Sequence, residues 1–155
     1  MKKQESGITR IVLFLLVFMI ISCENEQAAS DPKALDLNNV RELLQELDDE
    51  FSENFKNADS VALAEHYTTD GTLGSIKGKE NLISAWGKTI RSSNEDGTPY
   101  FNFKINSVSN HGEFLVEIGT YEFEDINNIV KNNGKYLVVR KLEDGKWKIY
   151  RDIGL

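Results

Sequence analysis

The chain has 155 residues, a formal net charge of −7 at pH 7 and one cysteine. One cysteine excludes an internal disulfide, and an acidic chain without a Lys/Arg cluster disfavours binding to nucleic-acid phosphates. The sequence has no Gly-x-Ser-x-Gly elbow, no Gly-rich phosphate loop and no His-Glu-x-x-His helix. We therefore expect no nucleic-acid partner, no metal and no cofactor.

The N-terminus has the layout of a secretory signal peptide. Lys2, Lys3 and Arg10 come first, eleven apolar residues (11–21) follow, and the small residue Ser22 ends the run. Eleven helical residues extend only about 16 Å, against roughly 30 Å for the hydrocarbon core of a bilayer. This segment is therefore too short for a comfortable permanent span.

Cys23 follows directly, and the stretch Ile20-Ile21-Ser22-Cys23 resembles a bacterial lipobox. The resemblance implies that residues 1–22 are removed and that Cys23 receives diacylglycerol, which anchors the protein to a membrane of the bacterial envelope, outside the cytoplasm. The alternative is an incidental or buried cysteine at the end of a short signal anchor. Residues 1–22 carry a net charge of +2, so their removal leaves a mature chain with a net charge of about −9, from −7 minus +2.

Two further regions follow the signal peptide. Residues 23–35 are small, polar and charged, and we expect a lipidated, flexible tether. Residues 36–155 are enough for one domain with a hydrophobic core. No fixed-period repeat interrupts them.

The first half of the domain has helical spacing. A long helix is predicted over 36–55 with Asp36 as N-cap, because apolar residues recur every three to four positions: Val40, Leu43, Leu44, Leu47, Phe51 and Phe55. We interpret the acidic residues on its other face as solvated. A second helix is predicted over 60–67, a short extended piece over 72–76, and a third helix over 79–91.

The second half alternates with period two. Four strands are predicted, at 101–108, 113–124, 135–142 and 146–153, and the tripeptides "NHG" (110–112), "NNG" (132–134) and "EDG" (143–145) between them are hairpin signals. We therefore expect an α+β fold in which three N-terminal helices pack on an antiparallel sheet.

The order of the segments "HYTTDGTL", "IKGKENLISAW", "EIGTYEF" and "GKYLVVRKLEDGKWKIYRDI" resembles the nuclear-transport-factor-two-like superfamily, also called ketosteroid-isomerase-like or SnoaL-like. Over residues 38–155 the chain is most similar to a small uncharacterised branch of it. The resemblance implies a strongly curved antiparallel sheet that forms a cystatin-like cone around a pocket. It also implies homodimers through the outer face of the sheet.

The isomerase chemistry of this superfamily is not expected. The resemblance aligns Ser75 with the aspartate base of the steroid isomerases, and the first helix offers Phe51 and Phe55 instead of the oxyanion tyrosine. That reaction needs a carboxylate base and a neutral oxyanion donor, so both departures argue against it.

Asp152 is the remaining candidate base. Strand alternation places it on the same face as Tyr150, and resemblance to hydrolase branches of the superfamily implies that it points into the pocket. Arg140 would position it, and Tyr121 or Tyr136 would supply a hydroxyl. The alternative is an ordinary cross-strand ion pair between Asp152 and Arg140 on the outer face.

The aromatic residues and histidines complete the candidate site. We expect core or pocket-wall positions for five aromatic residues: Tyr67, Trp86, Tyr136, Trp147 and Tyr150. A strand bulge would be needed for Trp147 to reach the interior. His111 lies in a predicted turn and is expected to be exposed, whereas His66 has either a place at the cone mouth or a surface position.

Two functions remain. In the first, the domain binds a small, partly apolar ligand or a protein partner without chemistry. In the second, it is a hydrolase or a lyase/isomerase-type enzyme that uses Asp152 as base on a small apolar substrate. The loss of the base aspartate at position 75, with no complete constellation in its place, favours the first.

Overall fold

The computed structural model describes residues 36–155. The predicted signal peptide, the tether and Cys23 lie outside these residues. Within residues 36–155, no helix has both the length and the hydropathy needed to cross a membrane.

The long first helix is confirmed as α2, Leu37–Lys56. Asp36 caps it, because its carboxylate accepts a hydrogen bond from the Asn38 N–H at 3.0 Å. One face is buried against the sheet through Val40, Leu44, Phe51 and Phe55, and also through Asp48. The acidic residues on the other face are exposed, as expected: Glu42, Glu46, Asp49, Glu50 and Glu53.

Two shorter helices follow. α3 spans Ser60–Glu65 and is capped by Asp59, whose carboxylate accepts from the Ala62 N–H at 2.9 Å. The prediction that this helix reaches Tyr67 is wrong, because Tyr67 already pairs with Ile149 in the sheet. α4 spans Lys79–Glu95 and buries Leu82, Trp86 and Ile90, which confirms the third helix about one turn longer than predicted.

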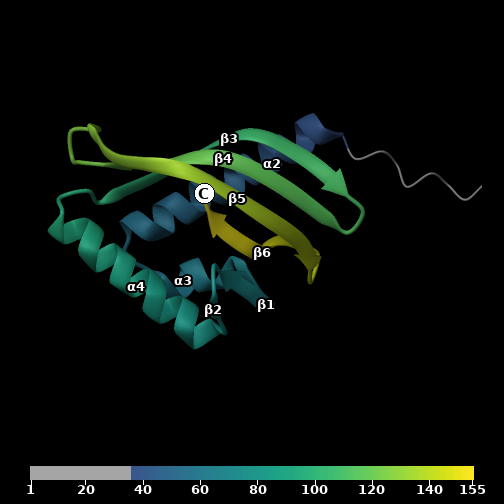
Figure 1. The fold of residues 1–155 in the computed structure, drawn as a ribbon, viewed down its shortest axis with the longest axis horizontal. Coiled ribbons are helices and arrows are strands. Elements are labelled where there is room, and N and C mark those ends of the chain that lie inside the picture. Colours follow the sequence, from purple (N-terminus) through teal and green to yellow (C-terminus); the bar gives the residue numbers. More distant parts are fainter. Residues whose placement is uncertain (1–35) are drawn as a thin grey trace, which may run out of the picture. The chain divides into compact units, whose positions relative to one another are not determined.

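The sheet has six strands in the order β2-β1-β6-β5-β4-β3. Their bounds are β1 Tyr67–Leu73, β2 Ile76–Lys77, β3 Tyr100–His111, β4 Phe114–Glu124, β5 Val130–Glu143 and β6 Lys146–Gly154. The expectation of a purely antiparallel sheet is wrong, because β1 pairs with β6 in parallel. The long strands β3, β4 and β5 curve together, and α2 crosses beneath them (Figure 1).

The predicted "EDG" turn is confirmed, whereas only the last residue of "NHG" lies in a turn, because Asn110 and His111 still pair with β4. Asp144 and Gly145 both have positive φ, 53° and 77°, as a type I′ turn requires, and Gly112 has φ 71°. The "NNG" tripeptide is not a turn, because residues 132–134 pair with β4 inside β5. The connection is made earlier, where the Asp125 carboxylate accepts the N–H groups of Asn127 and Ile129 at 2.8 and 3.0 Å.

The core lies between the helices and the inner face of the sheet. Most of it is aromatic: Phe51, Phe55, Trp86 and Phe101 pack with ring centroids 5.0 to 6.4 Å apart. A second cluster near the start of α2 contains Val40, Leu44, Ile105 and Leu115, with Trp147 packed against it. The interior of the fold is therefore occupied largely by side chains.

Candidate functional site

A bulge in β6 decides which residues reach the interior. Arg140 pairs with Ile149 and Val139 pairs with Arg151, so Tyr150 is left unpaired and the alternation shifts by one. Asp152 consequently points inward, whereas Tyr150 lies on the opposite face. The expectation that Tyr150 shares a face with Asp152 is wrong.

Tyr150 packs on the outer face of the sheet instead. Its ring stacks on Phe114 at 5.5 Å between centroids. The Arg151 guanidinium lies 3.5 Å from the centroid of the Tyr150 ring. Trp147 lies on the inner face of the sheet, where it packs against the second core cluster.

Asp152 is held by Tyr67, not by Arg140. The Tyr67 hydroxyl donates to Oδ2 of Asp152 at 2.7 Å, joining the first residue of β1 to β6. Asp152 as a residue is half-buried, but burial of its carboxyl group raises its pKa to about 6, and the Tyr67 hydrogen bond and the Arg140 charge act in the opposite direction. Burial, together with the Asp152 charge, raises the pKa of Tyr67 well above its ordinary value.

Arg140 belongs to a different group of side chains, the buried polar cluster, which consists of Asp48, Glu117, Tyr136 and Arg140. Arg140 Nε donates to Glu117 at 2.9 Å, and its terminal nitrogen bonds Asp48. The Tyr136 hydroxyl lies 2.6 Å from Glu117 and 3.3 Å from Asp48. The predicted Asp152–Arg140 contact is not formed, because the ion-pair partners of Arg140 are Asp48 and Glu117. The alternative pair on the outer face is not formed either, because the Arg140 residue is only 2% exposed.

The groups of the buried polar cluster shift one another's pKa. Burial raises the pKa of Asp48 to about 8, while the charge of Arg140 opposes this and Glu117 adds to it. Burial disfavours the charged form of Arg140, but Glu117 and Asp48 outweigh that effect and the pKa of Arg140 is raised. The Arg140 guanidinium thus has two carboxyl groups as hydrogen-bond partners, as a buried charge requires.

The remaining predicted residues are placed in the aromatic core. Tyr121 packs edge-on against Phe101 and Phe123, with centroids 5.6 and 5.9 Å apart. Trp86 is 5% exposed, and within residues 36–155 its indole N–H has no hydrogen-bond partner. The hydroxyl that reaches Asp152 is that of Tyr67, which the sequence did not single out for this role.

The two histidines differ in environment. His66 contacts the Asn54 side chain at 3.1 Å through Nε2 and packs edge-on against Phe51. Burial lowers the pKa of His66, so its ring is neutral at pH 7. His111 is exposed at the end of β3, as predicted.

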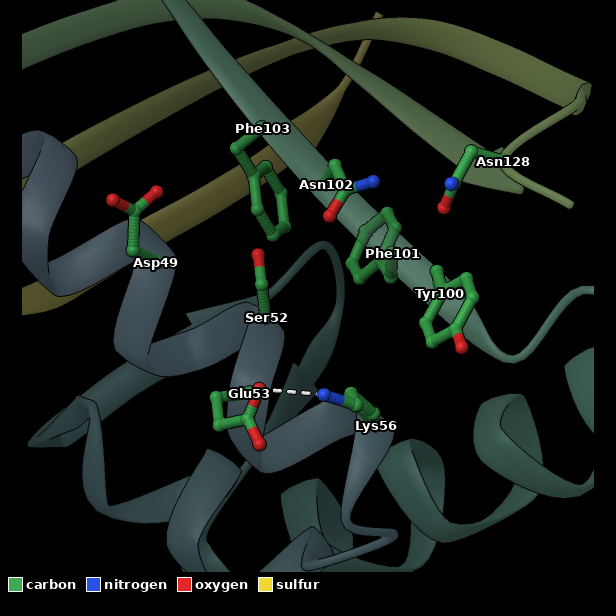
Figure 2. Close-up of a pocket in the computed structure, with 9 residues that line it drawn as sticks. All are labelled: Asp49, Ser52, Glu53, Lys56, Tyr100, Phe101, Asn102, Phe103 and Asn128. Carbon is green, nitrogen blue, oxygen red and sulfur yellow. Dashed lines mark hydrogen bonds and ion pairs between the residues drawn. The ribbon is translucent and has the colours of Figure 1, made fainter. Parts of the chain in front are cut away.

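A hollow lies elsewhere, between α2 and the first residues of β3, and we call it the edge groove. Its volume is about 470 Å³, within the range of about 300 to 1,000 Å³ typical of ligand pockets. Figure 2 shows α2 on one side and β3 on the other. It is lined by Asp49, Ser52, Glu53, Lys56, Tyr100, Phe101, Asn102, Phe103 and Asn128.

The chemistry of the edge groove is mixed. The four α2 residues, at spacing i, i+3, i+4 and i+7, form one helical face, on which Lys56 pairs with Glu53 at 3.2 Å. Across from them lie three aromatic rings and two side-chain amides. The sequence alone does not reveal this groove, because an acidic helix face is typical of a solvated surface and no local pattern shows that β3 borders it.

Within residues 36–155, no group of three or more His, Cys, Asp and Glu side chains is arranged to hold a metal ion.

Comparisons with known proteins identify the fold. No family model matches the chain, and no curated protein matches it. Among solved structures, it is similar to an NTF2-like protein with a cystatin-like fold from Novosphingobium aromaticivorans, with TM-score 0.59, 15% identity and coverage of 97% of this chain and 90% of that one.

A cystatin-like-fold domain of unknown function from Nostoc punctiforme has TM-score 0.60 and 10% identity, with 73% and 74% of the two chains covered. An NTF2-like protein of unknown function from Shewanella oneidensis has TM-score 0.57 and 14% identity, with 76% and 98% covered. The chain therefore has the α+β, cystatin-like fold of NTF2-like proteins, and at these identities the likeness extends to the fold alone.

Proposed function

We propose that this protein is a lipid-anchored, non-catalytic binding protein of the bacterial envelope, whose domain takes a small, partly apolar ligand or a segment of a protein partner in the edge groove. The observation that carries the proposal is the groove itself. It combines three aromatic rings with six polar or charged side chains, and this mixed lining suits a ligand that has both apolar and polar parts.

The arrangement of the interior supports binding over catalysis. The charged groups of the buried polar cluster are bound to one another, and aromatic side chains fill the adjoining space. Asp152 has Tyr67 as its hydrogen-bond donor but lacks the positioning arginine that a base of the predicted kind would use. Acid–base catalysis needs a base within reach of substrate, and here the carboxylate is engaged inside the fold.

The membrane anchor is supported by the order of segments at the N-terminus. A charged start, a short apolar run and the lipobox-like stretch before Cys23 favour lipidation over a spanning helix. Residues 23–35 would then connect the lipid to the domain. Since the mature chain is acidic, the lipid must supply membrane affinity without help from a basic surface.

Homodimers through the outer face of the sheet are part of the same proposal. Val116 pairs with Val139, and Ile118 pairs with Leu137, which in turn pairs with Ile153. Ile118 is 38% exposed and Ile153 is 42% exposed. An apolar patch of cross-strand neighbours suits a self-complementary, two-fold interface.

The test maps where small molecules bind. The mature protein in detergent micelles, labelled with ¹⁵N, is titrated separately with N-acetylphenylalanine amide, N-acetyllysine amide, indole and N-acetylglucosamine. We expect amide shifts that gather at Tyr100, Asn102 and Asn128. Shifts that gather at Tyr67 and Asp152, or no shifts with any probe, would contradict the proposal.

The enzyme alternative has one observation in its favour. A carboxyl group whose pKa lies at about 6, next to a tyrosine hydroxyl, has the protonation behaviour of a general acid or base near neutral pH. Its test is the same titration repeated on Asp152→Asn. If the wild-type protein binds a probe and Asp152→Asn does not, the result would favour a site at Asp152.

A further inference from the structure

Strand β3 forms one edge of the six-stranded sheet. The side of β3 that faces away from β4 therefore has no strand partner, and its backbone N–H and C=O groups need other partners or water. Natural proteins usually cover such an edge, and here part of the cover comes from α2.

Two side chains of α2 cap the middle of the β3 edge. Arg41 donates to the carbonyl groups of Ile105 and Asn106, the second at 3.3 Å. Gln45 donates to the Phe103 carbonyl at 3.3 Å. These contacts show that the carbonyl groups of Phe103 and Ile105 point away from β4.

The same alternation applies two residues earlier. In an antiparallel pair, every second residue directs both its N–H and its C=O away from the partner strand. Phe101 is in register with Phe103 and Ile105, so its N–H and C=O point to the edge, as does the Phe103 N–H. Among residues 36–155, no side chain bonds these three backbone groups, and they border the edge groove.

The charge beside this stretch of β3 is negative. Asp49 is exposed on α2, and one of its carboxylate oxygens accepts from Gln45 at 2.9 Å. Glu53 already has Lys56 as its partner. Among residues 36–155, Asp49 is therefore the lining carboxylate that has no ion-pair partner, and it favours a positive charge on whatever binds.

We propose that the edge groove binds an extended, basic segment of a partner protein, which adds to β3 as a seventh strand. The backbone of the segment would exchange hydrogen bonds with Phe101 and Phe103, and a Lys or Arg side chain would reach Asp49. This inference rests on the proposed function and names the class of partner. The tether of this chain is a poor occupant on charge, because residues 24–35 carry Glu24, Glu26 and Asp31 against Lys33.

The experiment selects binders from a phage-displayed library of random linear decapeptides on the full mature protein in detergent micelles. We expect enriched peptides that alternate apolar and polar residues and contain Lys or Arg. The best peptide is then synthesised with N-methyl groups on one or the other set of alternate amides. Methylation of the set that faces β3 should weaken binding at least about tenfold, and methylation of the other set should not.

Two protein variants locate the charge. Asp49→Lys should weaken binding of the selected peptide about tenfold, because it replaces attraction by repulsion inside the groove. Glu46→Lys is the matched control, since it makes the same charge change at an exposed position of α2 outside the groove lining, and it should change binding by no more than about twofold.

Three results would overturn the inference: no enriched peptide, binding that is indifferent to N-methylation, or equal effects of Asp49→Lys and Glu46→Lys. If small probes still shift the groove amides while peptides fail, the proposed function stands and the strand-addition inference does not. If neither small probes nor peptides bind at the groove, both fail.

Discussion

The hydroxyl group of Tyr67 donates a 2.7 Å hydrogen bond to the carboxylate of Asp152 and so ties the start of β1 to the end of β6. The two residues are 85 positions apart in the chain, and their strands pair in parallel. The carboxylate that the sequence suggests as a base therefore takes part in a contact that holds two strands of the sheet together.

Tyr67→Phe should raise the pKa of Asp152 further above about 6, because the hydrogen bond favours the charged form and its loss leaves only the Arg140 charge to oppose burial. The unfolding free energy at pH 7 should fall by about 1 to 3 kcal/mol, the usual cost of an unsatisfied buried acceptor. Carboxyl ¹³C titration and urea unfolding measure the two effects. An unchanged pKa would show that the hydroxyl does not stabilise the carboxylate.

Ionisation of Asp152 and Asp48 should reduce the stability of the domain as pH rises from about 4 to about 8. Asp152 and Asp48 have folded pKa values of about 6 and about 8, above the unfolded value of about 3.9, so the folded state binds more protons in this window. The contribution of these two groups to stability is fully present below the unfolded pKa of about 3.9 and is lost as each group ionises in the folded state. Urea unfolding across this pH range gives the slope.

Asp48→Asn is the matched variant for that slope, because its amide mimics the protonated carboxyl and cannot ionise. The loss of stability between pH 6 and pH 8 should become smaller in this variant than in the wild type. Asp49→Asn, at an exposed neighbouring position, is the control and should keep the wild-type slope. Identical slopes in all three proteins would show that Asp48 is ionised throughout.

Arg140→Met should destabilise the domain by about 3 to 5 kcal/mol, because it leaves Glu117 and Asp48 buried without a positive partner. Lys141→Met, at the next position on the other face of β5, should cost less than about 1 kcal/mol, since its ion pair with Glu113 is exposed. Chemical denaturation compares them. Equal losses would contradict the role of the buried polar cluster.

The proposed dimer predicts an effect of Ile118→Lys, which places a charge in the apolar outer patch. The mature protein should elute as a dimer and the variant as a monomer when molar mass is measured by light scattering after size exclusion. Lys135→Ala, an exposed change on the same side of the sheet, should leave the mass unchanged. A monomeric wild type would exclude this interface.

Cys23→Ala tests the anchor. The wild-type protein extracted from membranes should have a mass that corresponds to a chain starting at residue 23 with added diacylglycerol, and the variant should lack the lipid and leave the membrane fraction. A wild-type chain that still begins at Met1 without lipid would mean that residues 11–21 are an uncleaved anchor.

Local patterns predicted the helices and most strands, because buried residues repeat at helical spacing in α2 and α4 and at every second position in β5. Non-local pairing was not predictable in the same way. Nothing in the sequence of residues 67–73 shows that they pair in parallel with β6, and this pairing is what brings Tyr67 to Asp152. The helix that was extended to Tyr67 and the purely antiparallel sheet are both errors of this kind.

The predicted site differs from the structure at Tyr150 and at the partner of Arg140. Strict alternation placed Tyr150 beside Asp152, but the bulge at Tyr150 shifts the order, so that Tyr150 faces out and Asp152 faces in. The predicted pair of Arg140 with Asp152 is also wrong, because the partners of Arg140 depend on where α2 places Asp48 and where β4 places Glu117. Such contacts between elements are set by packing and not by local spacing.

Ligand entry at the edge groove, rather than beside Asp152, is tested most directly by one comparison of three proteins. The small probe that shifts the wild-type groove amides most is titrated into Ser52→Trp, which fills the groove, and into Asp152→Asn. We expect the shifts to disappear in Ser52→Trp and to persist in Asp152→Asn. Shifts that persist in Ser52→Trp and disappear in Asp152→Asn would contradict the proposed site.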